Sequence, residues 1–207
     1  LRSFVDTHDC SVLTNYQELA RMIDPAACID YWLVNIYGGT WDWGGNNWTA
    51  ARERTSQGRF QYYTWDSEGA FGIYGRNDPL TFNSITSTLL NKNTYMSRIF
   101  TAAYASEEFQ RLFKDRVYAL FFREGALTDA CIQRRFDELA DALDPVMHYV
   151  RGDNVNRSGI QNWINVRRPV VLQQLSSAGL HDERVAPTIS PEGGDVTNGT
   201  LVTLSHP

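Results

Sequence analysis

Apolar residues recur at helical spacing over much of the chain. Residues 15–23 have a short helical pattern, and Asp24 followed by Pro25 is typical of the N-cap and first position of a second helix. A glycine pair at positions 38 and 39 marks the end of that helix. Its buried face is expected to consist of Ile29, Trp32, Leu33 and Ile36.

Helical spacing returns after Ser84. Ser106 and Thr128 are suited to cap the starts of two helices, and Asp144-Pro145 is expected to interrupt the second of them. A last helix is predicted over residues 158–177, with a kink at Pro169. The apolar positions expected to face the core are Tyr95, Met96, Ile99, Phe100, Ala103, Phe109, Leu112, Phe113, Leu120, Ile132, Phe136, Leu139, Leu143, Ile160, Trp163, Ile164 and Val171.

The pattern changes between these two helical regions. Residues 40–47 form a loop rich in Trp, Asp and Gly, and segments 48–53 and 59–65 are rich in aromatic residues. A turn through residues 56–58 joins the two segments, which favours an antiparallel hairpin. The predicted fold is therefore mainly α with a small antiparallel β-hairpin, an α+β arrangement.

The composition changes again after Gly179. The last segment contains prolines, glycines and the alternating run 199–204, which is typical of a strand and not of a helix. We therefore expect one mainly helical domain over residues 1–180, followed by a linker and the truncated start of a β-rich module over residues 181–207.

Composition and charge exclude several classes of protein. With 43% hydrophobic and 21% charged residues, the chain lies in the range of globular proteins. A net charge of −5 argues against a protein that binds nucleic acid by neutralising phosphates. No apolar run approaches the roughly 18–20 residues that a membrane span needs. We expect no nucleic-acid partner and no membrane span.

Polar residues are most concentrated at one end of the predicted hairpin. Asp42 and Asn47 have the spacing of the Asp and Asn in the catalytic loop of protein kinases. Asp66 and Glu68 follow the second strand, where kinase-like folds place a carboxylate that binds Mg²⁺. Carboxylate and amide oxygens are suitable ligands for this hard ion.

Each of these residues also has a structural interpretation. Asp42 and Asn46 are common turn residues, and Asp66 fits a helix cap or a salt bridge equally well. Core packing is the ordinary role of the tryptophans in this region. The residue pattern alone leaves both interpretations open.

Three segments in the same order resemble the CotH kinase-like family, named for a spore-coat protein. They are residues 30–35 (DYWLVN), 41–48 (WDWGGNNW) and 60–68 (FQYYTWDSE). The Trp-Asp-x-Glu signature resembles the branch found in large multidomain bacterial proteins, and Arg167-Arg168-Pro169 resembles the family's closing helix. The likeness covers residues 14–179. The tail at 186–194 resembles the start of a chitobiase C-terminal-type β-sandwich module.

The resemblance implies a role for each matching residue. Asp42 is then the catalytic-loop acid, Asn47 a metal-binding amide and Asp66 the principal Mg²⁺ carboxylate, with Glu68 as a second acidic group. Further residues are carried over only as candidates that line the site: Asn46, Arg52, Trp43 and Trp48.

The resemblance also implies ATP and Mg²⁺ as ligands, and a protein whose Ser or Thr hydroxyls accept the γ-phosphoryl group in the intact parent. The chain resembles the C-terminal lobe of such an atypical kinase without the lobe that clamps the nucleotide, because the residues before Asp42 have a helical pattern and contain no lysine. We therefore expect the isolated chain to bind ATP weakly and to be inactive as a kinase.

Further domains are expected on both sides of this chain in its parent, at the surface of a bacterium or secreted from it. The alternative function is a non-catalytic module whose Trp-rich loop, including Trp43 and Trp48, binds a glycan or a protein.

Overall fold

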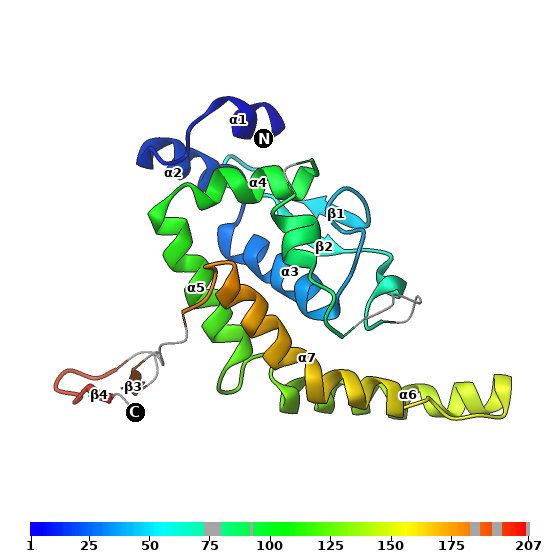
Figure 1. Ribbon diagram of the computed structural model, residues 1–207. Coiled ribbons are helices and arrows are strands. Elements are labelled where there is room, and N and C mark those ends of the chain that lie inside the picture. The colour runs from blue at the N-terminus through cyan, green and yellow to red at the C-terminus, as the bar shows by residue number, and fades with distance from the viewer. Residues whose placement is uncertain (73–79, 92, 183–186, 192–195, 206–207) are drawn as a thin grey trace.

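The computed structural model describes residues 1–72, 80–91, 93–182, 187–191 and 196–205 (Figure 1). In this part of the chain a bundle of helices packs against a small antiparallel hairpin, which confirms the predicted fold class. The helices are α1 (Arg2–Thr7), α2 (Leu13–Met22), α3 (Pro25–Gly38), α4 (Tyr95–Tyr104), α5 (Glu107–Phe121), α6 (Asp129–Arg151) and α7 (Ser158–Ser177). Two short turns, η1 (Ser67–Gly69) and η2 (Ile85–Leu89), are a 3₁₀ and a π-helical turn.

Helix α3 lies at the centre of the bundle, in contact with α5, α7 and the hairpin (Figure 1). The Asp24 side chain caps it by accepting a hydrogen bond from the Ala27 N–H, and Pro25 occupies its first turn, as predicted. It ends at Gly39, which has a φ of 62°. The four residues of the predicted stripe are fully buried, and Tyr31 and Tyr37 bury other faces of the helix.

The predicted hairpin consists of β1 (Trp48–Ala51) and β2 (Gln61–Thr64), which pair antiparallel with Trp48 opposite Thr64. Side chains alternate across it, so Tyr62 is buried toward α3 while Tyr63 is half-exposed on the other face. The hairpin therefore has one face against the core and one face open to solvent.

The expected interruption at Asp144-Pro145 is wrong. Helix α6 continues through Pro145, an exposed residue, to Arg151, although the proline removes one helical hydrogen bond. Arg157, which precedes α7, pairs with Asp137, Asp141 and Asp144 and so connects α7 to the part of α6 before the proline. Leu139 and Leu143, expected to face the core, are exposed instead. Ile132, Phe136 and Ile160 are only half-buried.

The core ends with Leu180, and the described residues of the tail lie outside it. Strands β3 (Thr188–Ser190) and β4 (Thr203–Ser205) pair antiparallel, close to the predicted strand at 199–204. Ala186 and residues 192–194, part of the segment that resembles a β-sandwich module, lie outside the described residues. The division into two domains stays a prediction. No described helix combines the length and hydropathy that crossing a membrane would need.

Candidate functional site

A buried tryptophan and a tightly packed glycine attach the loop that carries Asp42 to the helical bundle. Trp43 is fully buried, and its ring lies edge-on to Tyr31 at 5.9 Å between centroids. The Gly44 carbonyl accepts a hydrogen bond from the Met96 N–H at 3.1 Å. A Cβ at Gly44 would lie 2.5 Å from the Thr88 side chain, so only glycine fits there. Both contacts hold the Asp42 loop against the bundle.

A hydrogen bond joins the side chains of Asp42 and Asn47 directly. The Asn47 Nδ2 donates a hydrogen bond to the Asp42 Oδ2 at 2.6 Å and a longer one to the Asp66 backbone carbonyl at 3.5 Å. Asn47 itself has a φ of 56°, a conformation that asparagine tolerates better than most residues. The side chain of Asn47 therefore bridges the two segments of the candidate site.

Asp66 and Glu68 stand at the same end of the hairpin. Asp66 precedes η1 with a φ of 55°, and both side chains are exposed. A hydrogen bond with the Asp66 side chain, together with the negative charges of Asp66 and Asp42, raises the pKa of Glu68 above its usual value. The Glu68 carboxylate therefore lies within the field of two other carboxylates, an unfavourable arrangement that a cation would relieve.

The chemistry of this donor set fits Mg²⁺. Carboxylate oxygens of Asp42, Asp66 and Glu68 are hard ligands, and the Asn47 amide supplies a further oxygen. Among the described residues, however, no group of three His, Cys, Asp or Glu side chains forms a complete metal site. Mg²⁺ often binds through one or two carboxylates together with substrate phosphates and water. The arrangement therefore suits an ion that arrives with a phosphate ligand.

The remaining predicted residues have different positions. Asn46 is exposed beside the cluster, and its N–H donates to the Asp42 carbonyl at 3.2 Å. Trp48 is half-buried and stacks on Tyr95 at 4.9 Å, so it supports β1. Arg52 follows β1 at the opposite end of the hairpin, where it lies over the Phe60 ring. The structure therefore keeps Arg52 apart from the carboxylates.

The buried position of Trp43 also argues against the alternative function. A ring with no exposed surface cannot stack on a glycan, and the Trp48 ring is occupied by Tyr95. The tryptophans with substantial exposed surface are Trp41 at 46% and Trp65 at 67%, which the sequence did not distinguish from the others. The expectation that Trp43 forms part of a binding surface is therefore wrong, whereas a binding role for the half-buried Trp48 stays a prediction.

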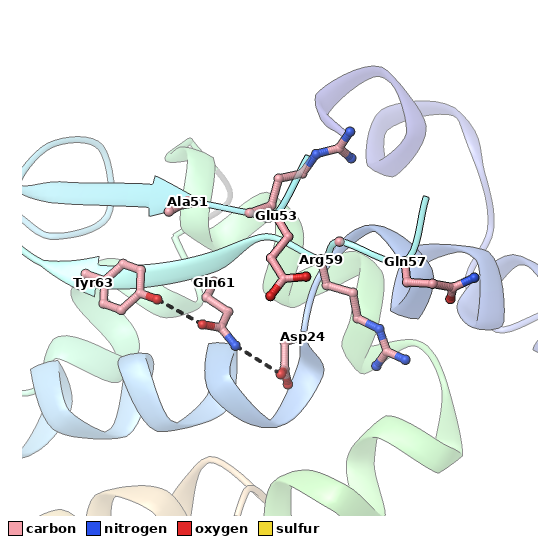
Figure 2. A pocket seen from close by; sticks show the side chains of 9 residues that line it. Asp24, Ala51, Glu53, Gln57, Arg59, Gln61 and Tyr63 are labelled. Atoms are coloured by element: carbon pink, nitrogen blue, oxygen red, sulfur yellow. Dashed lines mark hydrogen bonds between the residues drawn. The ribbon is translucent and has the colours of Figure 1, made fainter. Parts of the chain in front are cut away.

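A hollow lies at the other end of the hairpin, and Arg52 is among the residues that line it. Figure 2 shows it from close by. It has a volume of about 510 Å³ and is lined by polar groups, with Gln61 hydrogen bonded to both Asp24 and Tyr63. Arg59 and Glu53 add one charge of each sign. No sequence pattern predicted this hollow, because Asp24 and the hairpin turn approach one another only in the folded chain.

Comparison with models of protein families shows which family the chain belongs to. The family model described as CotH kinase protein matches residues 3–170, and the chain therefore belongs to the CotH kinase family. The chain accordingly contains a kinase-like domain. No curated protein and no solved structure matches it.

Proposed function

We propose that this chain is the catalytic-loop and Mg²⁺-binding lobe of an atypical protein kinase. In the intact parent it would transfer the γ-phosphoryl group of ATP to a Ser or Thr hydroxyl of a protein. The observation that carries the proposal is the hydrogen bond between Asn47 and Asp42 beside Asp66 and Glu68. Membership of the CotH kinase family supports the same chemistry.

Each acidic residue has a defined role in this proposal. Asp42 accepts the proton of the attacking hydroxyl as the new O–Pγ bond forms and the bond from Pγ to the leaving oxygen of ADP breaks. Asn47 holds the Asp42 carboxylate through its amide N–H and offers its amide oxygen to the metal. Asp66 and Glu68 would hold Mg²⁺ with Asn47. When bound, this ion neutralises charge on the transferring phosphates.

Most of the rate enhancement in such a reaction comes from positioning and charge stabilisation. The buried Trp43 and the close packing at Gly44 support this requirement, because they restrict the Asp42 loop before any ligand binds. A small number of catalytic and metal-binding side chains at this end of the hairpin is then sufficient for the reaction.

The test is transfer of radiolabelled γ-phosphate by the full-length parent to a protein acceptor. Asp42→Asn and Asp66→Asn are each expected to lower the rate by at least about a hundredfold, within the range measured for single catalytic groups. Asp24→Asn is the matched control, since Asp24 caps α3 outside the carboxylate cluster. Equal rates in wild type and Asp66→Asn would overturn the metal assignment.

A further inference from the structure

Arg167, on α7, is a fully buried cation, and among the described residues its hydrogen bonds all go to backbone carbonyls. Its Nε and Nη2 donate to the carbonyls of Tyr37 and Ile36 at 2.9 and 2.7 Å. Its Nη1 and Nη2 donate to those of Leu80 and Phe82 at 2.6 and 2.9 Å. Burial lowers the pKa of the guanidinium to about 10, which leaves it charged at neutral pH.

The carbonyls of Ile36 and Tyr37 belong to the last turn of α3, where the helix itself supplies no further N–H donors, although the Ile36 carbonyl also accepts from the Gly39 N–H at 3.2 Å. The negative end of the helix dipole lies there as well. Among the described residues, Arg167 pairs with no carboxylate, so these carbonyls supply its electrostatic compensation. A charged and bidentate donor therefore fixes the end of α3 and the chain at residues 80–82 together.

Trp163, one turn earlier on α7, extends this contact. The Arg167 guanidinium lies over the Trp163 ring, 5.1 Å from its centroid. The Phe71 ring packs edge-on against the same Trp163 ring, with 5.7 Å between centroids. A Cβ at Gly39 would lie 2.9 Å from the Trp163 ring. The Phe71 N–H also donates to the Gly38 carbonyl at 2.7 Å. The segment after the hairpin is thereby attached to the end of α3.

The end of α3 and the chain at Phe71 both lie next to the candidate site along the sequence. Residues 36–40 precede Asp42, and Phe71 follows Glu68 after one short turn. We infer that Arg167 and Trp163 are positioning residues that set the separation between Asp42 and the Asp66–Glu68 turn. They act from α7 without touching any ligand. The part of this inference that concerns metal binding rests on the proposed function.

Arg168 provides a matched control on the same helix. Its Nε donates to the Phe121 carbonyl at 2.7 Å, and its guanidinium lies over the Phe122 ring at 5.3 Å. These residues lie at the end of α5. Arg168→Lys therefore changes a similar contact that does not involve the segments leading to the site.

The experiment compares Arg167→Lys with Arg168→Lys in the complete chain, at a temperature where each variant is folded. A lysine ammonium cannot reproduce the planar, forked donation of arginine. We expect amide hydrogen exchange at Thr40, Asn46 and Phe71 to accelerate at least about tenfold in Arg167→Lys and less than about twofold in Arg168→Lys. The NMR signals of the Asn47 side-chain amide are expected to shift only in Arg167→Lys.

Mg²⁺-dependent ATP binding, measured by calorimetry, is expected to weaken at least about fivefold in Arg167→Lys, within the usual range of coupling between sites. Equal exchange at these amides in the two variants would overturn the inference. If Arg167→Lys does not fold, Trp163→Phe takes its place in the comparison with Arg168→Lys, and the same differences in amide exchange are expected. If wild type binds no Mg²⁺-ATP, the proposed function fails, and the exchange comparison still decides whether Arg167 positions the loop.

Discussion

Two residues of the candidate site adopt the left-handed backbone conformation that glycine favours. Asn47 and Asp66 have φ values of 56° and 55°. Such conformations cost a residue with a Cβ roughly 1–2 kcal/mol and are common at functional sites. A carboxylate kept at position 66 despite this cost is consistent with a role for its side chain.

This strain gives a prediction for Asp66→Gly. Glycine relieves the left-handed conformation and the repulsion with Glu68, but it loses about 0.4–1 kcal/mol by making the unfolded chain more flexible. We expect the variant to be about 0.5 kcal/mol more stable than wild type in urea unfolding and to lose Mg²⁺-ATP binding. Asp66→Ala keeps the Cβ and serves as control. A glycine variant less stable than the alanine variant would contradict this argument.

Glu68 should reveal the carboxylate cluster through its titration. Its pKa is raised in the folded state, so folding favours its protonated form, and this contribution to stability is lost as the pH rises through the raised pKa. Mg²⁺ affinity is expected to decrease as the pH falls through the same range, because the proton competes with the ion.

NMR titration in Asp66→Ala tests the cause. Removal of Asp66 abolishes the hydrogen bond and one negative charge, so the pKa of Glu68 should fall toward its usual value. Asp144, whose pKa is lowered by the Val155 N–H and Arg157, should titrate identically in both proteins. An unchanged Glu68 titration would show that Asp66 is not its neighbour in solution.

At the scale of elements, the sequence predicted what depends on local signals. Asp24 and Pro25 define the start of α3, and the glycine pair defines its end. The hairpin also follows from alternation of side chains and a turn. The helix predicted to stop at Asp144-Pro145 is too short, because a proline is only a probable helix boundary and α6 continues through it to Arg151.

Pro145→Ala tests how much the proline weakens the last turns of α6. Alanine restores an N–H that can donate to the Asp141 carbonyl and removes a helix penalty of about 3 kcal/mol. Amides at 146–151 are therefore expected to exchange at least about tenfold more slowly. Pro169→Ala in α7 is the control, and it should leave these amides unchanged. Equal exchange in wild type and Pro145→Ala would mean that the end of α6 is not helical in solution.

At the scale of the whole molecule, the hydrophobic core is complete at Leu180, and the described residues of the tail add nothing to it. Tyr104 donates to the Gly179 carbonyl at 3.1 Å, and Lys114 pairs with Asp182. In the tail, Leu201 is 82% exposed and so contributes little to the stability of the core.

Truncation after Asp182 is accordingly expected to shift the melting temperature by less than about 2 °C, since 1 kcal/mol corresponds to about 2–4 °C for a domain of this size. Calorimetric melting of both chains measures this. A drop of more than about 5 °C would show that the tail packs on the helical domain and would contradict the predicted division at residue 180.

The candidate site was predictable only in part. Asp42, Asn47, Asp66 and Glu68 could be found from the sequence because they lie within one short stretch around a hairpin. Arg167 could not be assigned a role in this way. Its acceptors Ile36 and Tyr37 are about 130 residues away along the chain, and only the folded structure brings them together.

The central claim is that this chain holds a nucleotide through Mg²⁺ at the end of the hairpin. Calorimetric titration with Mg²⁺, ATP and both together, in wild type and in Asp66→Asn, tests it most directly. We predict weak ATP binding that requires Mg²⁺ and weakens at least about tenfold in Asp66→Asn, as expected on loss of a charged ligand. ATP binding that is independent of Mg²⁺, equal in both proteins or absent from wild type would contradict the claim.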